Sequence, residues 1–165
     1  MNYPIKFLDC TLRDGGYYNN WSFSKELINQ YLKAVNETKI NYIELGFRGL
    51  DKKKIKGNTA YTTDAFVNDL KIPKNLKIGV MVNAIDFLQT ELSSEEACRK
   101  LFPKTKNTKI KFVRIACHAD EPFEIVNVIK WLKRNNFMVT INLMQISEIK
   151  ENQIKKICKL LKGLS

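Results

Sequence analysis

Near its beginning the chain carries residues whose chemistry is typical of an active site. Arg13 and Asp14 are adjacent and opposite in charge, and Gly15 and Gly16 follow them directly. A carboxylate such as that of Asp14 suits a divalent cation, and a guanidinium can hold a carboxylate or stabilise an enolate oxygen. Two glycines straight after a strand predict a sharp turn that lets the backbone approach a ligand closely. The alternative is an ion pair that only closes this turn.

Another charged residue, Glu44, lies inside an otherwise apolar run at 42–47. A carboxylate in a buried strand is costly unless it is paired, and Arg13 is its natural partner. We therefore expect Arg13, Asp14 and Glu44 to form one polar cluster at one end of a sheet. Exposure of Glu44 on an edge strand is the alternative.

The elements that must position these residues follow from hydrophobic periodicity. Short runs rich in Val, Ile and Phe predict strands buried on both faces, at 5–11, 42–47, 77–83, 111–117 and 138–144. Longer segments with helical spacing lie between them. Ser22 or Ser24 is the expected N-cap of the first helix, whose inward stripe begins at Leu27 and Ile28, and Ser93 with Glu96 has the spacing of a capping box. Further helices are expected over 63–70, after Asp120, and over 154–161.

A strand followed by a helix, repeated about five times, predicts a parallel sheet with right-handed crossovers. An open doubly wound sheet and a partial (β/α)8 barrel both satisfy this α/β pattern. No glycine-rich phosphate-binding motif follows any strand, which weakens the nucleotide-binding version of the open sheet. We expect residues 1–165 to form a single domain.

The composition limits the binding partners and the cellular location that we expect. The net charge is +11, but most of the excess is lysine spread along the chain, so we expect no nucleic-acid partner. No apolar run approaches the roughly 20 residues of a membrane span, and there is no secretory signal, which predicts a cytoplasmic protein with no membrane contact. The four cysteines are scattered and are interpreted as small hydrophobes rather than as a disulfide or zinc framework.

Four further polar residues fall at or near the predicted strand ends. Arg114, Asn142 and Asn83 can point into the mouth of a barrel, and His118 follows the fourth strand. We treat all four as candidate substrate-binding residues. The alternatives are that they face a helix, cap a strand or, for His118, lie at the surface.

The segment Leu8 to Gly16, Leu-Asp-Cys-Thr-Leu-Arg-Asp-Gly-Gly, together with Ile-Glu-Leu-Gly at 43–46, resembles the DRE-type TIM-barrel metallolyases. That superfamily includes hydroxymethylglutaryl-CoA lyase, 4-hydroxy-2-oxovalerate aldolase, isopropylmalate and homocitrate synthases, and pyruvate carboxyltransferases. The chain is most similar to the 4-hydroxy-2-oxovalerate aldolase-like members.

The resemblance implies a metal-dependent carbon–carbon lyase or aldolase that acts on a 2-oxo acid or an acyl thioester through an enolate. It implies that Arg13 stabilises the enolate oxygen, that Asp14 binds Mg2+ or Mn2+, and that Glu44 holds Arg13. A condensing enzyme of the isopropylmalate or homocitrate synthase type is the second hypothesis. Those synthases typically continue Arg-Asp-Gly with Glu-Gln, whereas this chain continues with Gly16 and Tyr17.

The chain departs from the family pattern in its metal ligands, in its length and in the residue at position 17. The family takes two more metal ligands from a His-x-His pair on the sixth strand, whereas this chain has one histidine. A complete barrel needs about 250 residues, so the resemblance covers about the first five βα units, the N-terminal portion of a barrel. The pyruvate aldolases of the family also carry a catalytic histidine at the position of Tyr17. A tyrosine can relay a proton but is a weak base, and we keep Tyr17 as a candidate catalytic residue.

A half-barrel would expose strand edges and apolar faces. We therefore expect the chain to self-associate or to pair with a missing C-terminal half. A non-catalytic barrel fragment, used for assembly or small-molecule binding, is the alternative from a different functional class.

Overall fold

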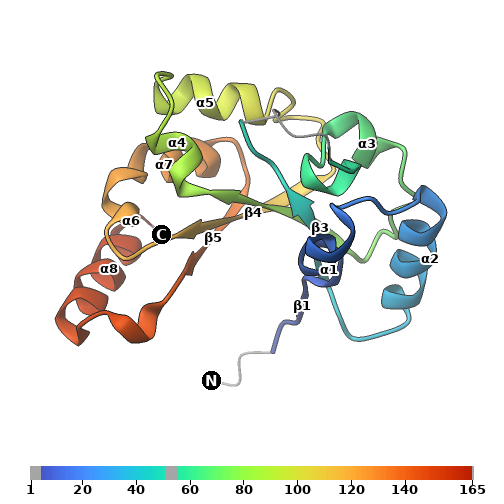
Figure 1. Ribbon diagram of the computed structural model, residues 1–165, viewed down its shortest axis with the longest axis horizontal. Helices are drawn as coiled ribbons and strands as arrows, with labels where there is room; N and C mark the ends of the chain where they lie inside the picture. Colours follow the sequence, from blue (N-terminus) through green and yellow to red (C-terminus); the bar gives the residue numbers. More distant parts are fainter. Residues whose placement is uncertain (1–4, 51–55, 165) are drawn as a thin grey trace.

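The computed structural model describes residues 5–50 and 56–164. Its sheet holds five strands: β1 (Leu8–Asp9), β2 (Tyr42–Phe47), β3 (Lys77–Asn83), β4 (Ile110–Cys117) and β5 (Met138–Leu143). The strands lie in sequential order, and every neighbouring pair is parallel. A doubly wound sheet reverses its strand order at a switch point, whereas a barrel does not. The sheet curls into half of a barrel, so the fold is a partial α/β barrel, as predicted (Figure 1).

Helices connect each strand to the next. After β1 come α1 (Thr11–Asn19) and α2 (Lys25–Asn36), and after β2 come the 3-10 turn η1 (Asn58–Ala60) and α3 (Asp64–Asn68). The β3–β4 connection holds α4 (Ala84–Leu88) and α5 (Ser94–Leu101), and the β4–β5 connection holds α6 (Glu121–Glu124) and α7 (Val126–Arg134). The 3-10 turn η2 (Ile146–Glu148) and α8 (Glu151–Gly163) follow β5. Among the described residues, no helix combines the length and apolar character needed to cross a membrane.

Several predicted helix starts are confirmed by their caps. The Ser24 side chain accepts a hydrogen bond from the main-chain N–H of Leu27 at 3.1 Å, and Ser93 forms the full capping box with Glu96. Asp120 precedes α6 but makes no capping bond through its side chain. The inward stripe of α2 is correct for Ile28, which is fully buried, but wrong for Leu27, which is exposed.

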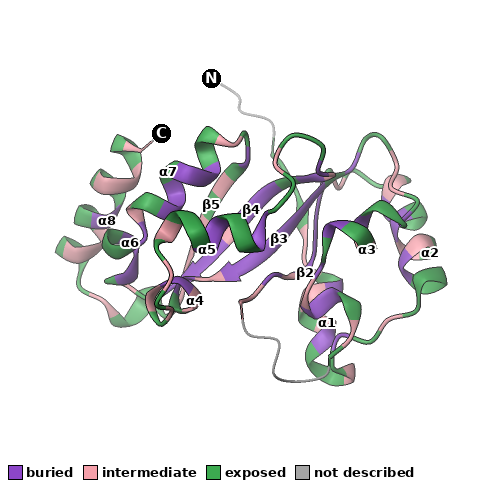
Figure 2. Cartoon of the chain, turned by 90° about the horizontal axis from the view of Figure 1, so that it is seen from above, coloured by how far each residue is buried: buried purple, intermediate pink, exposed green. Residues whose placement is uncertain are grey.

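The two faces of the sheet carry different side chains because side-chain direction alternates along each strand. One face packs against the helices and builds the main core, in which buried residues of β2, β3 and β4 meet those of α2, α5 and α7, as the buried residues coloured in Figure 2 illustrate. The opposite face becomes the inner surface of the half-barrel. Tyr42 and Phe112 pack there with ring centroids 5.8 Å apart, and a side chain at Gly79 would lie 2.3 Å from the Phe112 ring.

The last strand departs from the expectation that all strands are buried on both faces. Residues of β5 are exposed or half-buried, and Met138 is 42% exposed. β5 pairs with β4 along one edge, and within residues 5–50 and 56–164 no strand pairs with its other edge. The apolar composition of β5 therefore fits a strand whose neighbour lies outside the described sheet.

The first strand and its glycine turn are also corrected. The strand expected over 5–11 is limited to Leu8–Asp9, and the two glycines lie inside α1 with no positive φ angle among the described glycines. Asp9 explains the early start of the helix, because its carboxylate accepts a hydrogen bond from the main-chain N–H of Thr11 at 2.8 Å. Gly16 serves close packing instead, since a Cβ there would lie 2.0 Å from the Trp21 ring.

Candidate active site

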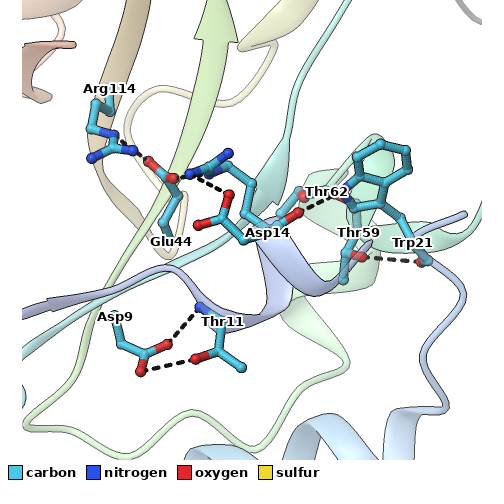
Figure 3. Close-up of polar contacts among 9 residues, drawn as sticks. Asp9, Thr11, Asp14, Trp21, Glu44, Thr59, Thr62 and Arg114 are labelled. Atoms are coloured by element: carbon cyan, nitrogen blue, oxygen red, sulfur yellow. Dashed lines mark hydrogen bonds and ion pairs between the residues drawn. The ribbon is translucent and has the colours of Figure 1, made fainter. Parts of the chain in front are cut away.

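The Glu44 side chain is completely buried between two arginines on the inner face of the half-barrel. One of its carboxylate oxygens accepts a hydrogen bond from Nε of Arg13, and the other lies 3.0 Å from Nε of Arg114 in an ion pair without hydrogen-bond orientation (Figure 3). The two arginine side chains remain 12% and 19% exposed. The expected pair of Arg13 and Glu44 therefore forms, and Arg114 joins it.

Asp14 completes the cluster on its solvent side. Its carboxylate lies 2.8 Å from a terminal nitrogen of Arg13, while its own side chain is 59% exposed. Burial disfavours the charged form of Arg13, but the attraction of Glu44 and Asp14 outweighs it and raises the pKa of Arg13. Arg13 is therefore a permanent cation, held in a defined orientation by Glu44 and by Asp14.

Three elements converge to build this cluster. Arg13 lies in the first turn of α1, Glu44 on β2 and Arg114 on β4. Between the two strands, β3 places Gly79 opposite Glu44 and Met81 opposite Arg114. The side chains therefore meet across β3, with Arg13 reaching in from the helix that follows β1.

Trp21 fixes the turn of α1 that carries Arg13. Its indole N–H donates to the main-chain carbonyl of Arg13 at 2.9 Å, and its own main-chain carbonyl accepts from the Thr59 hydroxyl at 3.0 Å (Figure 3). Trp21 adopts a left-handed backbone with φ of 58°, which is rare for a bulky side chain and persists only where surrounding contacts determine it. Trp21 could not be identified as part of the site from the sequence, because these contacts come from tertiary packing.

Cys10 adjoins the cluster from the end of β1. Burial and the neighbouring charge of Glu44 raise the pKa of its thiol to about 11. The thiol is therefore protonated at neutral pH, which agrees with the interpretation of Cys10 as a small packing group, whereas Cys158 is exposed and does not fit that interpretation. All four cysteines are free.

Tyr17 and Asn83 lie beside the cluster at a common cavity. Tyr17 is 64% exposed, and its ring packs edge-on against Trp21 and Phe47 at centroid distances of 4.7 and 6.3 Å. With Asn83, at the end of β3, it lines a cavity of about 370 Å³. Phe47 connects this cavity with the cluster, since the Arg13 guanidinium lies over its ring at 5.6 Å.

Asn142 and His118 differ in their relation to the cluster. Asn83, Ala116 and Asn142 are aligned across β3, β4 and β5, two residues beyond Met81, Arg114 and Thr140. Asn142 is therefore on the same inner face as Arg114, nearer the carboxyl ends of the strands. His118 is exposed, and its main-chain N–H donates to Glu121 at 2.6 Å. The described residues show no contact between the His118 side chain and the arginine cluster.

A second buried ion pair lies nearby and was not predicted. Arg48, just after β2, donates to the main-chain carbonyls of Thr62 and Leu101 at 2.8 and 3.0 Å and lies 3.2 Å from the Asp64 carboxylate. Burial lowers the pKa of Arg48, against the opposing effect of Asp64. Because these contacts tie the end of β2 to the start of α3 and to the end of α5, we interpret Arg48 as structural.

The described residues offer only part of a ligand set for the metal that the resemblance implies. In the part of the chain that the structure describes, no three His, Cys, Asp or Glu side chains are grouped to hold a metal ion. Asp14 has Arg13 as its ion-pair partner. The described residues therefore supply one candidate ligand and do not fit a complete metal centre.

The fold and the cluster place the chain among partial α/β barrels with charged side chains at the inner face. A solved structure with the same fold is the N-terminal domain of a "putative aldolase" from Bacteroides vulgatus. The two superpose with a TM-score of 0.77 at 26% sequence identity, over 96% of this chain and 60% of that one. This chain thus spans about 60% of the length of that structure. No protein-family profile and no curated protein matches the sequence.

Proposed function

We propose that this chain supplies part of the active site of an aldolase-like lyase that cleaves a carbon–carbon bond through an enolate. The observation that carries the proposal is the buried Glu44 carboxylate shared by Arg13 and Arg114. With Asp14 the cluster holds two guanidiniums and two carboxylates, and the guanidiniums are 12% and 19% exposed, so they can still donate hydrogen bonds to an anionic substrate and to a developing enolate oxygen. The similarity to an aldolase domain and the resemblance to the DRE-type metallolyases point to the same chemistry.

The proposed substrate is a 2-oxo acid or an acyl thioester that carries a hydroxyl group two carbons from its carbonyl. The bond between the carbon next to the carbonyl and the hydroxyl-bearing carbon breaks, and its electron pair moves onto the carbonyl oxygen to give the enolate. Arg13 stabilises that oxygen, and Arg114 binds the carboxylate or the thioester oxygen. As the new carbonyl forms, the hydroxyl proton leaves by way of Tyr17 to solvent, and the enolate carbon afterwards takes up one proton by the same route, so that no proton is gained or lost overall.

Glu44 acts as a positioning residue in this scheme. Its complete burial and its contacts with both arginines hold the two guanidiniums at a fixed separation, and preorganised charges stabilise a transition state without reorganisation during the reaction. Tyr17 lies one helical turn after Arg13 and lines the adjoining cavity, which makes it our candidate for relaying a proton.

The proposal also includes a divalent ion, for which Asp14 is the candidate ligand among the described residues. Mg2+ or Mn2+ suits a carboxylate ligand. Further ligands would have to come from outside the described residues, so no step above depends on the ion. Among the described residues no strand pairs with the outer edge of β5. We therefore propose that another segment or chain completes the barrel beside β5.

Cleavage of a 4-hydroxy-2-oxo acid, followed through pyruvate release with and without Mn2+, tests the proposal. Removal of a preorganised charge typically costs about a hundredfold or more in rate, so we expect Arg13→Ala to lower kcat/KM by at least that factor. Asp14→Ala tests the metal ligand and should weaken the response to Mn2+. Arg99→Ala is the matched control, because Arg99 pairs with Glu95 on the exposed face of α5. Full activity in Arg13→Ala and Asp14→Ala would refute the site assignment, and binding without turnover would favour a non-catalytic fragment.

A further inference from the structure

The cavity beside the arginine cluster has one aromatic wall and one polar wall. Tyr17, Trp21 and Phe47 pack edge to face along the first, with the Trp21 and Phe47 centroids 5.7 Å apart. Its volume of about 370 Å³ is within the range of small-molecule sites, roughly 300–1,000 Å³. The polar side chains that line the cavity include Lys56, Asn83 and Asp86.

Phe47 places the cavity next to the reacting centre. Its ring carries the Arg13 guanidinium at 5.6 Å and also lines the cavity. A substrate whose carbonyl lies at Arg13 can therefore extend its remaining carbons past Phe47 and along the aromatic wall. Aromatic faces suit the C–H groups of such a chain, because they bury apolar area without requiring a hydrogen bond.

The charges along the cavity differ in whether they are available to a ligand. Arg48 lines the cavity, but its guanidinium is occupied by Thr62, Leu101 and Asp64. Lys56 is exposed, with its ammonium 4.7 Å from the centre of the Trp21 ring. A flexible ammonium above an aromatic wall can move onto an anionic group of a ligand.

The acceptors of the polar wall favour hydroxyl groups. Carboxylate and amide oxygens accept hydrogen bonds from hydroxyls, and the Asn83 amide can also donate. Lys56 and Asn83 thus give the cavity a group for an anion and a group for a hydroxyl.

We infer that this cavity binds the distal part of the substrate, and that this part carries hydroxyl groups and a terminal anion, either a carboxylate or a phosphate. Lys56 pairs with the anion, Asn83 binds the hydroxyls, and the aromatic wall packs against the carbon chain. The inference rests on the proposed function, because it takes Arg13 as the reacting end.

Tryptophan fluorescence tests this inference without turnover. The chain has two tryptophans, and Trp131 lies in the core on α7, so Trp131→Phe leaves Trp21 as the reporter in the full chain. The wild-type chain serves as a second reporter, with Trp131 as a constant background. The probes are glycerol 3-phosphate and glycerate, which combine hydroxyls with an anion, against glycerol, which lacks the anion, and butyrate, which lacks the hydroxyls.

We expect saturable fluorescence changes with glycerol 3-phosphate or glycerate, and none with glycerol or butyrate at the same concentrations. The stronger of the two anionic probes identifies the terminal group. Lys56→Gln should weaken that binding roughly threefold to tenfold, the size of a partly exposed charged contact. Lys33→Gln, an exposed lysine on α2, should leave it unchanged.

Equal responses to all four probes, no saturable response, or an unchanged affinity in Lys56→Gln would overturn the inference. Such a result would leave the proposed function standing if pyruvate release still depended on Arg13. If pyruvate release no longer depended on Arg13 while probe binding stayed intact, the proposed function would be refuted and the binding role of the cavity would stand.

Discussion

Arg114 on β4 and Glu44 on β2 meet across the inner face of the half-barrel, with Nε of Arg114 3.0 Å from a carboxylate oxygen of Glu44. The two strands are separated by β3, so the contact depends on the curl and register of the sheet rather than on strand pairing. Because Glu44 is completely buried, its charge depends on Arg114 and Arg13 for compensation. The same contact therefore governs both stability and the proposed chemistry.

Replacing Glu44 by glutamine should destabilise the fold strongly. Glutamine keeps the shape but removes the buried charge that compensates two partly buried guanidiniums, and breaking a buried ion pair from one side typically costs about 3 kcal/mol or more. Urea denaturation of Glu44→Gln measures the loss. Glu95→Gln is the matched control, because the exposed pair of Glu95 with Arg99 should be worth about 0.5 kcal/mol. Equal unfolding midpoints for the two variants would show that the buried cluster contributes no stability.

Neighbouring glycines of α1 should respond in opposite directions to alanine. A Cβ at Gly16 would lie 2.0 Å from the Trp21 ring, whereas at Gly15 its nearest neighbour is Phe23 at 3.6 Å. Gly16→Ala should therefore cost about 2 kcal/mol or more through overpacking. Gly15→Ala should stabilise the helix by up to about 1 kcal/mol. Thermal unfolding of the two variants provides the comparison, and a tolerated Gly16→Ala would contradict the close packing of Trp21.

The regular part of the fold could be predicted from the sequence, because it depends on local signals. The apolar runs predicted the bounds of β2 and β3, and the serine caps predicted where α2 and α5 begin. The pairing of Arg13 with Glu44 also followed, since a lone carboxylate in an apolar strand requires a cation.

Other features depended on contacts that no local pattern encodes. The glycines after Asp14 indicated a turn, but the Asp9 carboxylate starts a helix there and the Trp21 ring requires Gly16. Arg114 was a candidate for substrate binding, yet its position beside Glu44 follows from the register across β3. The cavity that joins Tyr17 to Asn83 likewise arises from the meeting of α1 with two strand ends.

Thiol reactivity should separate the four cysteines. Burial and Glu44 raise the pKa of Cys10 to about 11, and burial raises the pKa values of Cys98 and Cys117 to about 12. At pH 8 about one Cys10 in a thousand is then a thiolate, and thiolates are the reactive form. Alkylation followed by mass spectrometry should therefore modify the exposed Cys158 first.

The alkylation rate of Cys10 should rise with pH. Because the folded pKa of Cys10 is raised, its alkylation rate should increase about tenfold per pH unit from pH 8 toward 11. The stability that comes from keeping these three thiols protonated is present below their ordinary pKa and is lost as the pH rises through the folded values. Rapid modification of Cys10 at pH 8 in the folded chain would contradict its placement beside Glu44.

The free edge of β5 should make the chain associate. Its backbone groups on that side have no partner strand among the described residues, and Met138 is 42% exposed at the start of the strand. Unpaired strand edges recruit other strands, so light scattering after size exclusion should show a mass that increases with concentration. Met138→Lys should shift the equilibrium toward monomer, because a charge on an edge strand opposes pairing. Phe123→Lys on α6, where a similarly exposed apolar side chain lies on a helix rather than on the edge strand, should have no such effect. A stable monomer at all concentrations would refute this use of the edge, and equal effects of both substitutions would assign the association to general surface hydrophobicity.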